Sequence, residues 1–119
     1  MTVTKQIFSG STDGEGIKVV ATTSTGTTIH TVSSTATDFD EIWLWATNNH
    51  TTDVLLTVEW GVTTAPDGNI ILTIPMHRGL VLVAPGLSLK GNASPHIVTA
   101  FAGITNVISI HGFVNRISA

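Results

Sequence analysis

The sequence predicts an all-β domain, and within that class an antiparallel β-sandwich of jelly-roll type with about eight strands. Short runs rich in Val, Ile, Thr and Trp recur along the chain, and Gly, Pro, Asn or Asp bound each run. No segment shows the sustained period of about 3.6 residues that marks an amphipathic helix. The predicted strands cover residues 17–22, 27–33, 41–47, 54–60, 70–74, 80–83, 97–102 and 107–117, and a short additional strand at 87–89 is left open.

The segments between the predicted strands carry recognisable turn chemistry. They fall at residues 24–26, 48–53, 66–69, 85–86 and 103–106. Glycine and asparagine accept the positive φ of tight turns, and proline presets the first turn position. Many short strands at this spacing are typical of a sandwich or a barrel, and we favour the jelly roll because about eight strands fit it.

The first fifteen residues differ from the rest in composition. They are rich in Ser, Thr and Gly and contain a single apolar pair, Ile7 and Phe8. We predict that residues 1–15 form an extended N-terminal arm that docks on a neighbouring subunit, and that residues 16–119 form the β-sandwich domain. A frayed terminus without a role is the alternative interpretation.

Three predicted strands are apolar on both sides, namely residues 41–47, 80–83 and 107–117. Strand residues alternate between the faces of a sheet, so each strand can be divided by parity. Residues 54–60 give one apolar side and one mixed side, as a half-buried strand should. In residues 41–47 and 107–117, however, aliphatic residues on one side are opposed by Trp43 and Trp45 in the first case and by His111 and Phe113 in the second.

A sandwich buries only one face of each sheet, so the second apolar face needs a cover. The cover is the arm, a loop of the chain or another subunit. Aromatic residues are enriched at subunit interfaces because they offer a large contact area. We therefore predict an interface with other subunits, and packing under the chain's own loops is the alternative. The predicted interface residues are Ile7, Phe8, Trp43, Trp45, His111 and Phe113.

Charged residues make up 11% of the chain, whereas about 25% is typical. A free monomer keeps its solubility through surface charge, so this shortage predicts that part of the surface is hidden against partners. The alternative is that threonine supplies the polar surface instead. The net charge is -3 and the five Lys and Arg residues are scattered, which disfavours nucleic-acid binding.

The search for catalytic and metal-binding patterns predicts no enzyme, no metal and no cofactor. The chain has no cysteine, and its histidines show no metal-ligand spacing. Asp38, Asp40 and Glu41 are the only acidic cluster. They could act as a general acid and base or hold calcium, but turn formation before a strand is the simpler explanation. The apolar runs are too short to cross a membrane and no secretory signal is recognisable, so we expect a soluble protein that assembles in the cytoplasm.

Four segments together resemble a known class of proteins. They are Glu41-Ile42-Trp43-Leu44-Trp45-Ala46, Val58-Glu59-Trp60-Gly61, Leu82-Val83-Ala84-Pro85-Gly86-Leu87 and Gly112-Phe113-Val114-Asn115-Arg116-Ile117. In pattern and order they are similar to small all-β structural proteins of tailed phages, of the capsid decoration (cement), head-fibre or tail accessory type. The resemblance extends from about Phe8 to Ile117.

This resemblance implies a virion structural protein, assembled in the cytoplasm of the bacterial host. The implied function is capsid decoration, in which a homotrimer binds and stabilises the lattice of the major capsid protein, and no catalytic residue is carried over. Two other functional classes stay open. A receptor-binding or carbohydrate-binding module of a phage fibre or tail could use Trp43 or Trp45 as a sugar-stacking platform. A small β-barrel enzyme is the third class.

Overall fold

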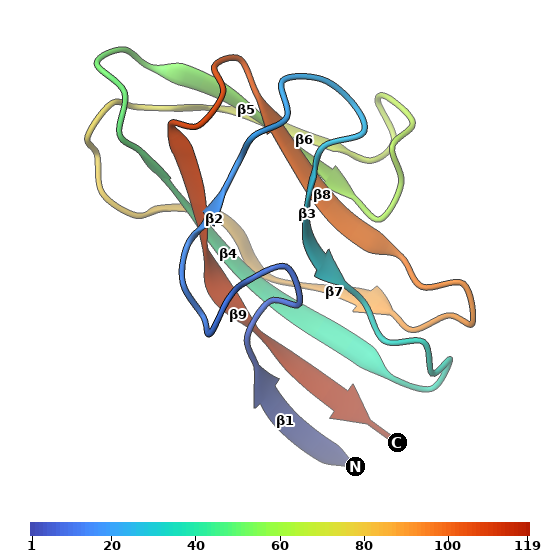
Figure 1. Ribbon diagram of the computed structural model, residues 1–119. Coiled ribbons are helices and arrows are strands. Elements are labelled where there is room, and N and C mark those ends of the chain that lie inside the picture. The colour runs from blue at the N-terminus through green and yellow to red at the C-terminus, as the bar shows by residue number, and fades with distance from the viewer.

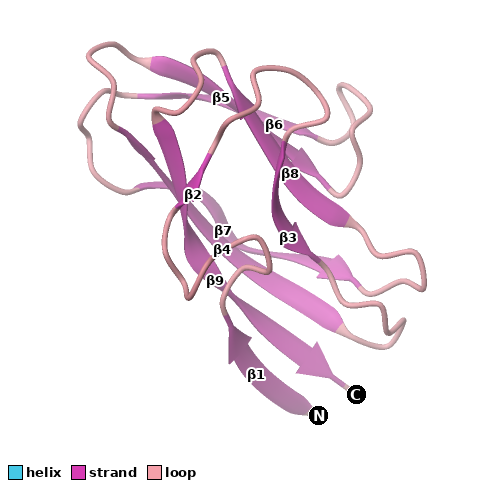
Figure 2. Ribbon diagram, viewed as in Figure 1, coloured by secondary structure: helices cyan, strands magenta, loops and turns pink.

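The computed structural model describes residues 1–119 and contains only strands and loops (Figure 2). No helix is present that could cross a membrane. The nine strands lie in two antiparallel sheets, so the all-β sandwich prediction is confirmed. The strands are β1 (Thr2–Gln6), β2 (Ile17–Lys18), β3 (Thr27–Thr31), β4 (Phe39–Asn48), β5 (Val54–Trp60), β6 (Asn69–Ile74), β7 (Val81–Lys90), β8 (Ile97–Ala102) and β9 (Ile108–Ser118).

The two sheets form the two layers of the sandwich (Figure 1). The five-stranded sheet has the order β1-β9-β4-β7, with β2 also paired to β9, and the four-stranded sheet has the order β3-β8-β5-β6. Only β5 and β6 are both consecutive in sequence and paired as a hairpin. Most other connections pass from one sheet to the other, which ties the two layers together along the chain.

The core lies between the sheets and consists of 19 buried apolar residues. It follows from the alternation along the strands. In β4, Ile42, Leu44 and Ala46 are fully buried, while the residues between them are partly exposed. In β5, Val54, Leu56 and Val58 point inward in the same way. The inward sides of both strands agree with the division by parity.

Strand β7 is longer than the sequence predicts. The prediction has a strand at residues 80–83, a turn at Pro85 and Gly86, and a possible short strand at 87–89. In the structure β7 is one continuous strand, and its register against β4 shifts between Ile42 and Trp43. Ile42 lies opposite Leu87 and Trp43 lies opposite Pro85, so Gly86 is an extra residue, with φ +76°. A β-bulge accommodates such a residue without ending the strand. The Pro-Gly pair, which the sequence analysis assigned to a turn, therefore lies within β7.

The predicted strand at residues 17–22 is also shorter in the structure, because the chain changes sheets within it. The N–H of Val19 donates to the carbonyl of Ile108 in β9, at 2.8 Å. Two residues later, the carbonyl of Ala21 accepts from the N–H of Ala102 in β8, at 3.1 Å. Only Ile17–Lys18 therefore counts as a strand of the first sheet.

The N-terminal segment is part of the sandwich, and the prediction of an extended arm at residues 1–15 is wrong in that respect. Strand β1 pairs with β9 from Thr2 opposite Ser118 to Gln6 opposite Val114, and the two termini lie side by side (Figure 1). Phe8 is 2% exposed and belongs to the core, whereas Ile7 is 49% exposed. The strand escaped prediction because its residues are mostly polar, as is common in an edge strand.

The burial of Phe8 yields a stability prediction. Phe8→Ala should lower the free energy of unfolding by about 3–5 kcal/mol, because it leaves a cavity in the core. Ile7→Ala is the matched control, since half of that side chain is already exposed, and it should change stability by less than about 1 kcal/mol. Urea unfolding measures both. Equal effects of the two variants would contradict the placement of Phe8.

Candidate functional site

The outer side of the five-stranded sheet carries a cluster of three aromatic rings, Trp43 and Trp45 from β4 and Phe113 from β9. Trp43 lies directly opposite Phe113 in the antiparallel ladder. The ring centroids are 6.2 Å apart for the two Trp rings, 6.3 Å for Trp43 and Phe113, and 6.2 Å for Trp45 and Phe113. The three ring planes are nearly parallel and each side chain is partly exposed. We call these three residues the aromatic cluster.

Polar neighbours fix the aromatic cluster in place. The indole N–H of Trp43 donates to Oε1 of Glu41 at 2.8 Å, and the Asn115 amide donates to the same oxygen at 3.2 Å. These hydrogen bonds lower the pKa of the Glu41 carboxyl. The ammonium of Lys5 in β1 lies 4.5 Å from the centroid of the Phe113 ring, in a cation–π contact. The rings are therefore held in one arrangement before any partner binds.

Gly86 leaves room for the Trp43 indole to pack against the backbone of β7. A Cβ atom built on Gly86 would lie 2.8 Å from Cζ2 of Trp43, which is closer than real contacts allow. The position also has a positive φ, which favours glycine. The bulge in β7 thus places bare backbone against the indole ring, a role that the sequence pattern did not reveal.

More apolar residues surround the aromatic cluster on the same side of the sheet. The strand registers place them in line with the rings: Val3 and Ile117 face each other across β1 and β9, and Leu82 lies opposite Trp45. Phe39 lies opposite Ile117 in the β4–β9 ladder. Val3, Phe39 and Leu82 are among the most exposed large apolar residues of the chain. The apolar outer face therefore extends across β1, β9, β4 and β7.

The predicted interface residues fall into three groups. Trp43, Trp45 and Phe113 come together in the aromatic cluster. His111 lies opposite Trp45, but the β1–β2 connection contacts it, since a Cβ built on Gly16 would lie 2.6 Å from its Cε1 atom. Ile7 is exposed in that same connection, whereas Phe8 is in the core and offers no surface to a partner.

A buried network of charged and polar side chains, which the sequence did not predict, lies at one end of the sandwich. Asp40 in β4 is fully buried and accepts from Nε and Nη2 of Arg116 in β9, both at 2.8 Å. Nε2 of His30 in β3 lies 2.8 Å from the same carboxylate. Burial by itself raises the pKa of Asp40, but the Arg116 and His30 contacts outweigh it and hold the pKa below its ordinary value.

The hydrogen bonds fix the tautomer of His30. Its Nδ1 accepts from the backbone N–H of Ser9 at 3.1 Å, so the ring proton is on Nε2 and is donated to Asp40. The Ser9 hydroxyl accepts from the N–H of Thr31 at 2.7 Å instead of contacting the imidazole. This cluster therefore lacks the hydroxyl–imidazole contact of a nucleophilic triad, and its contacts tie the N-terminal segment to β3 and β4.

The acidic residues considered as a catalytic or calcium-binding group point in different directions. Asp38 accepts from the Ser33 hydroxyl at 2.7 Å, Asp40 is inside the sandwich, and Glu41 lies on the outer face beside Trp43. No group of three or more His, Cys, Asp and Glu residues is arranged to hold a metal ion.

The buried imidazole gives a pH-dependent prediction. Desolvation by burial lowers the pKa of His30 below 6.5, despite the opposing effect of Asp40. The unfolded chain then binds the proton more readily than the folded chain, so the stability from neutral His30 is complete above about pH 6.5 and decreases as the pH falls below it. The slope from this one proton is at most about 1.4 kcal/mol per pH unit.

Urea unfolding between pH 8 and pH 5, with an NMR titration of the histidine rings, measures this dependence. His30→Gln should be less stable than the parent at pH 8 and should show a smaller pH slope. A His30 ring that titrates above 6.5 in the folded protein would contradict the prediction.

The chain was also compared with known proteins. No protein-family model, curated protein or solved structure matches it.

Proposed function

We propose that this chain is a non-enzymatic structural subunit, which associates with copies of itself through the apolar outer face of its five-stranded sheet. The observation that carries the proposal is the aromatic cluster, Trp43, Trp45 and Phe113, partly exposed at the middle of that face. A single large aromatic side chain buries about 150–250 Å² when it is covered, so three neighbouring rings supply a strong centre for an interface.

The contacts around the cluster favour association over simple exposure. The indole N–H of Trp43 already donates to Glu41, so it keeps a hydrogen-bond partner when another subunit covers the ring. The rings are fixed by Glu41, Gly86 and Lys5, so little side-chain freedom is lost when a partner binds. Both effects lower the free-energy cost of association.

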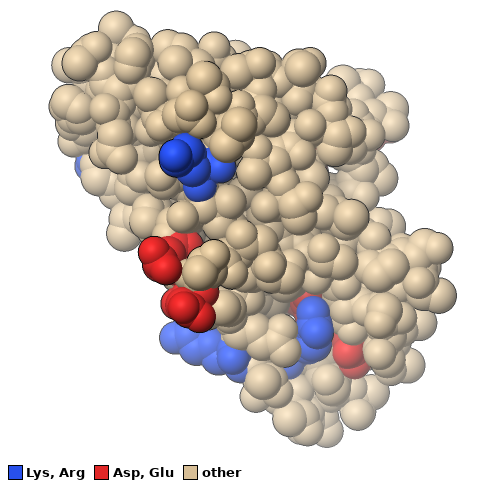
Figure 3. All heavy atoms as spheres, viewed as in Figure 1, with Lys and Arg blue, Asp and Glu red and all other residues tan.

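The scarcity of charge supports the same conclusion. Charged residues are 11% of the chain, and most of the face drawn in Figure 3 is free of them. The charged residues beside the rings, Lys5 and Glu41, are engaged with Phe113 and Trp43. Depletion of free charge at the centre is a property of stable protein interfaces.

The specific function that we propose is that of a virion protein, a homotrimeric capsid decoration protein that also binds the major capsid protein. The resemblance to tailed-phage structural proteins is the main support. The strand order adds to it, because β2-β9-β4-β7 packed on β3-β8-β5-β6 fits the eight-stranded jelly roll that we propose, an architecture common in viral capsids and also in lectins.

The oligomer is tested by analytical ultracentrifugation at micromolar concentration, where we expect a trimer. Trp45→Ser and Phe113→Ser should each weaken association by about 2 kcal/mol or more, roughly thirtyfold, while a thermal transition of the monomer remains. Leu55→Ser is the matched control, because Leu55 is an exposed apolar residue on the outer side of the other sheet. A parent protein that sediments as a monomer would overturn the preformed oligomer.

The virion role is tested on purified particles of the phage that encodes the chain. Mass spectrometry should detect the protein in these particles in a fixed ratio to the major capsid protein, and particles that lack it should bind the purified protein. Its absence from intact particles would reject the virion role but not the oligomer.

A further inference from the structure

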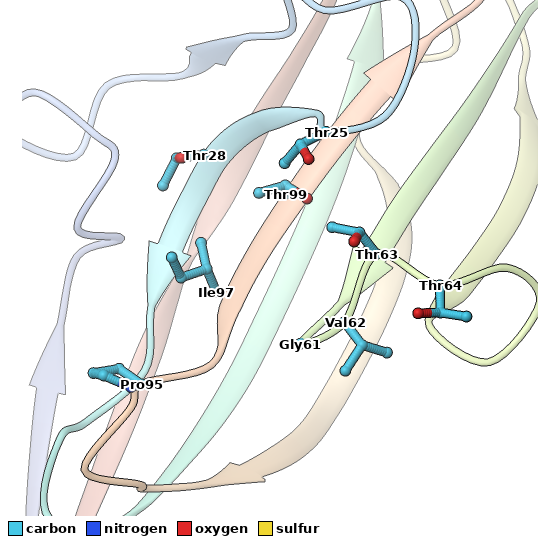
Figure 4. Close-up of a pocket in the computed structure, with 9 residues that line it drawn as sticks. All are labelled: Thr25, Thr28, Gly61, Val62, Thr63, Thr64, Pro95, Ile97 and Thr99. Carbon is cyan, nitrogen blue, oxygen red and sulfur yellow. The ribbon is translucent and has the colours of Figure 1, made fainter.

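A groove of about 450 Å³ lies on the outer side of the four-stranded sheet, on the layer opposite to the aromatic cluster (Figure 4). Its lining comes from the β2–β3 connection, from β3, from the segment after β5, from Pro95 in the β7–β8 connection and from β8. Five of its nine lining residues are threonines, each with a hydroxyl and a methyl group: Thr25, Thr28, Thr63, Thr64 and Thr99. The volume is in the range of small-molecule sites.

A buried carboxylate holds the floor and one wall of the groove. Glu59 of β5 is fully buried and accepts from the Thr99 hydroxyl at 2.7 Å, the backbone N–H of Gly26 at 2.8 Å and the Ser24 hydroxyl. Burial raises the pKa of Glu59, but these three hydrogen bonds outweigh it and keep the pKa low. The residues on both sides of Thr25 are thereby fixed to the sheet.

The opposite wall is fixed by its own backbone. The carbonyl of Thr64 accepts from the N–H of Gly68 at 3.0 Å, and the carbonyl of Gly68 accepts from the N–H of Trp60 at 2.6 Å. These bonds close the loop that carries Thr63 and Thr64. Both walls are therefore in place without a ligand, which reduces the ordering cost of binding one.

The chemistry of the lining selects a class of ligand. The side chains of Thr25, Thr28, Thr63 and Thr64 make no hydrogen bond within the chain, so their hydroxyls can donate to and accept from a ligand. Thr99 gives its proton to Glu59 and keeps its lone pairs free as acceptors. No charged side chain lines the groove, and Val62 and Ile97 face it with apolar surface.

We propose that this groove binds a neutral saccharide. Threonine offers a hydroxyl for the sugar hydroxyls and a methyl group for the apolar C–H surface of the ring, and Val62 and Ile97 extend that apolar contact. The absence of charged side chains from the lining disfavours phosphate, sulfate and carboxylate groups as ligands. Since the groove and the aromatic cluster lie on opposite sides of the sandwich, the subunit can bind the sugar while it is assembled.

The test is a titration of the full chain with neutral saccharides, followed by two-dimensional amide NMR. The probes are glucose, galactose, mannose, N-acetylglucosamine and their common disaccharides. At least one should shift the amide signals of residues 61–64, 25–28 and 97–99 and leave the indole N–H signals of Trp43 and Trp45 in place. Linear polymers of the same sugars, tested by co-precipitation, distinguish a polysaccharide ligand from a free sugar.

Matched variants locate the binding. Thr63→Val and Thr28→Val remove a hydroxyl and keep the shape of the side chain, and together they should weaken binding at least tenfold. Thr73→Val, on the same sheet but outside the groove, should leave the affinity unchanged. The proposal is overturned if no saccharide shifts the groove signals, or if the shifts occur at the Trp indoles instead. Neither result depends on whether the chain forms the proposed oligomer.

Discussion

The long antiparallel pairing between β4 and β9 is the contact on which the rest of the molecule depends. It runs without a register shift from Phe39 opposite Ile117 to Asn48 opposite Ile108. Because side chains alternate along both strands, this one register fills the core with aliphatic residues on one side and assembles Trp43, Trp45 and Phe113 on the other. A slip by one residue would exchange the two sides, so the core and the aromatic cluster are specified together.

The same ladder also positions the buried ion pair that anchors the N-terminal segment. Asp40 lies directly opposite Arg116, with both side chains directed inward at the end of the sandwich. Burial of a carboxylate is costly unless it is fully paired, and here Arg116 and His30 supply its donors. Through His30 and Ser9 the network reaches the segment that carries Phe8 into the core. An ion pair, an imidazole and an edge strand thus stabilise one end of the fold as a unit.

The two outer faces of the sandwich carry different features. The five-stranded sheet presents stacked aromatic rings with few free charges, whereas the groove on the four-stranded sheet presents hydroxyls above a buried carboxylate. The first surface suits a partner that covers a broad apolar area, and the second suits a small polar ligand. Under the proposed function, the chain attaches through the first layer and keeps the second layer accessible.

The sequence by itself determined the all-β class, most strand positions and the side on which the Trp residues of β4 lie, because these depend on local alternation and turn chemistry. It could not place Phe8, since its burial depends on a residue far along the chain: the ring packs against Gly112, where a side chain would leave no room for it. Nor could it reveal the bulge at Gly86, the partners of Asp40 or the threonine groove, whose residues come from distant segments. These features arise from strand register and sheet-to-sheet packing, which are contacts between residues far apart in the chain, so only the tertiary structure decided them.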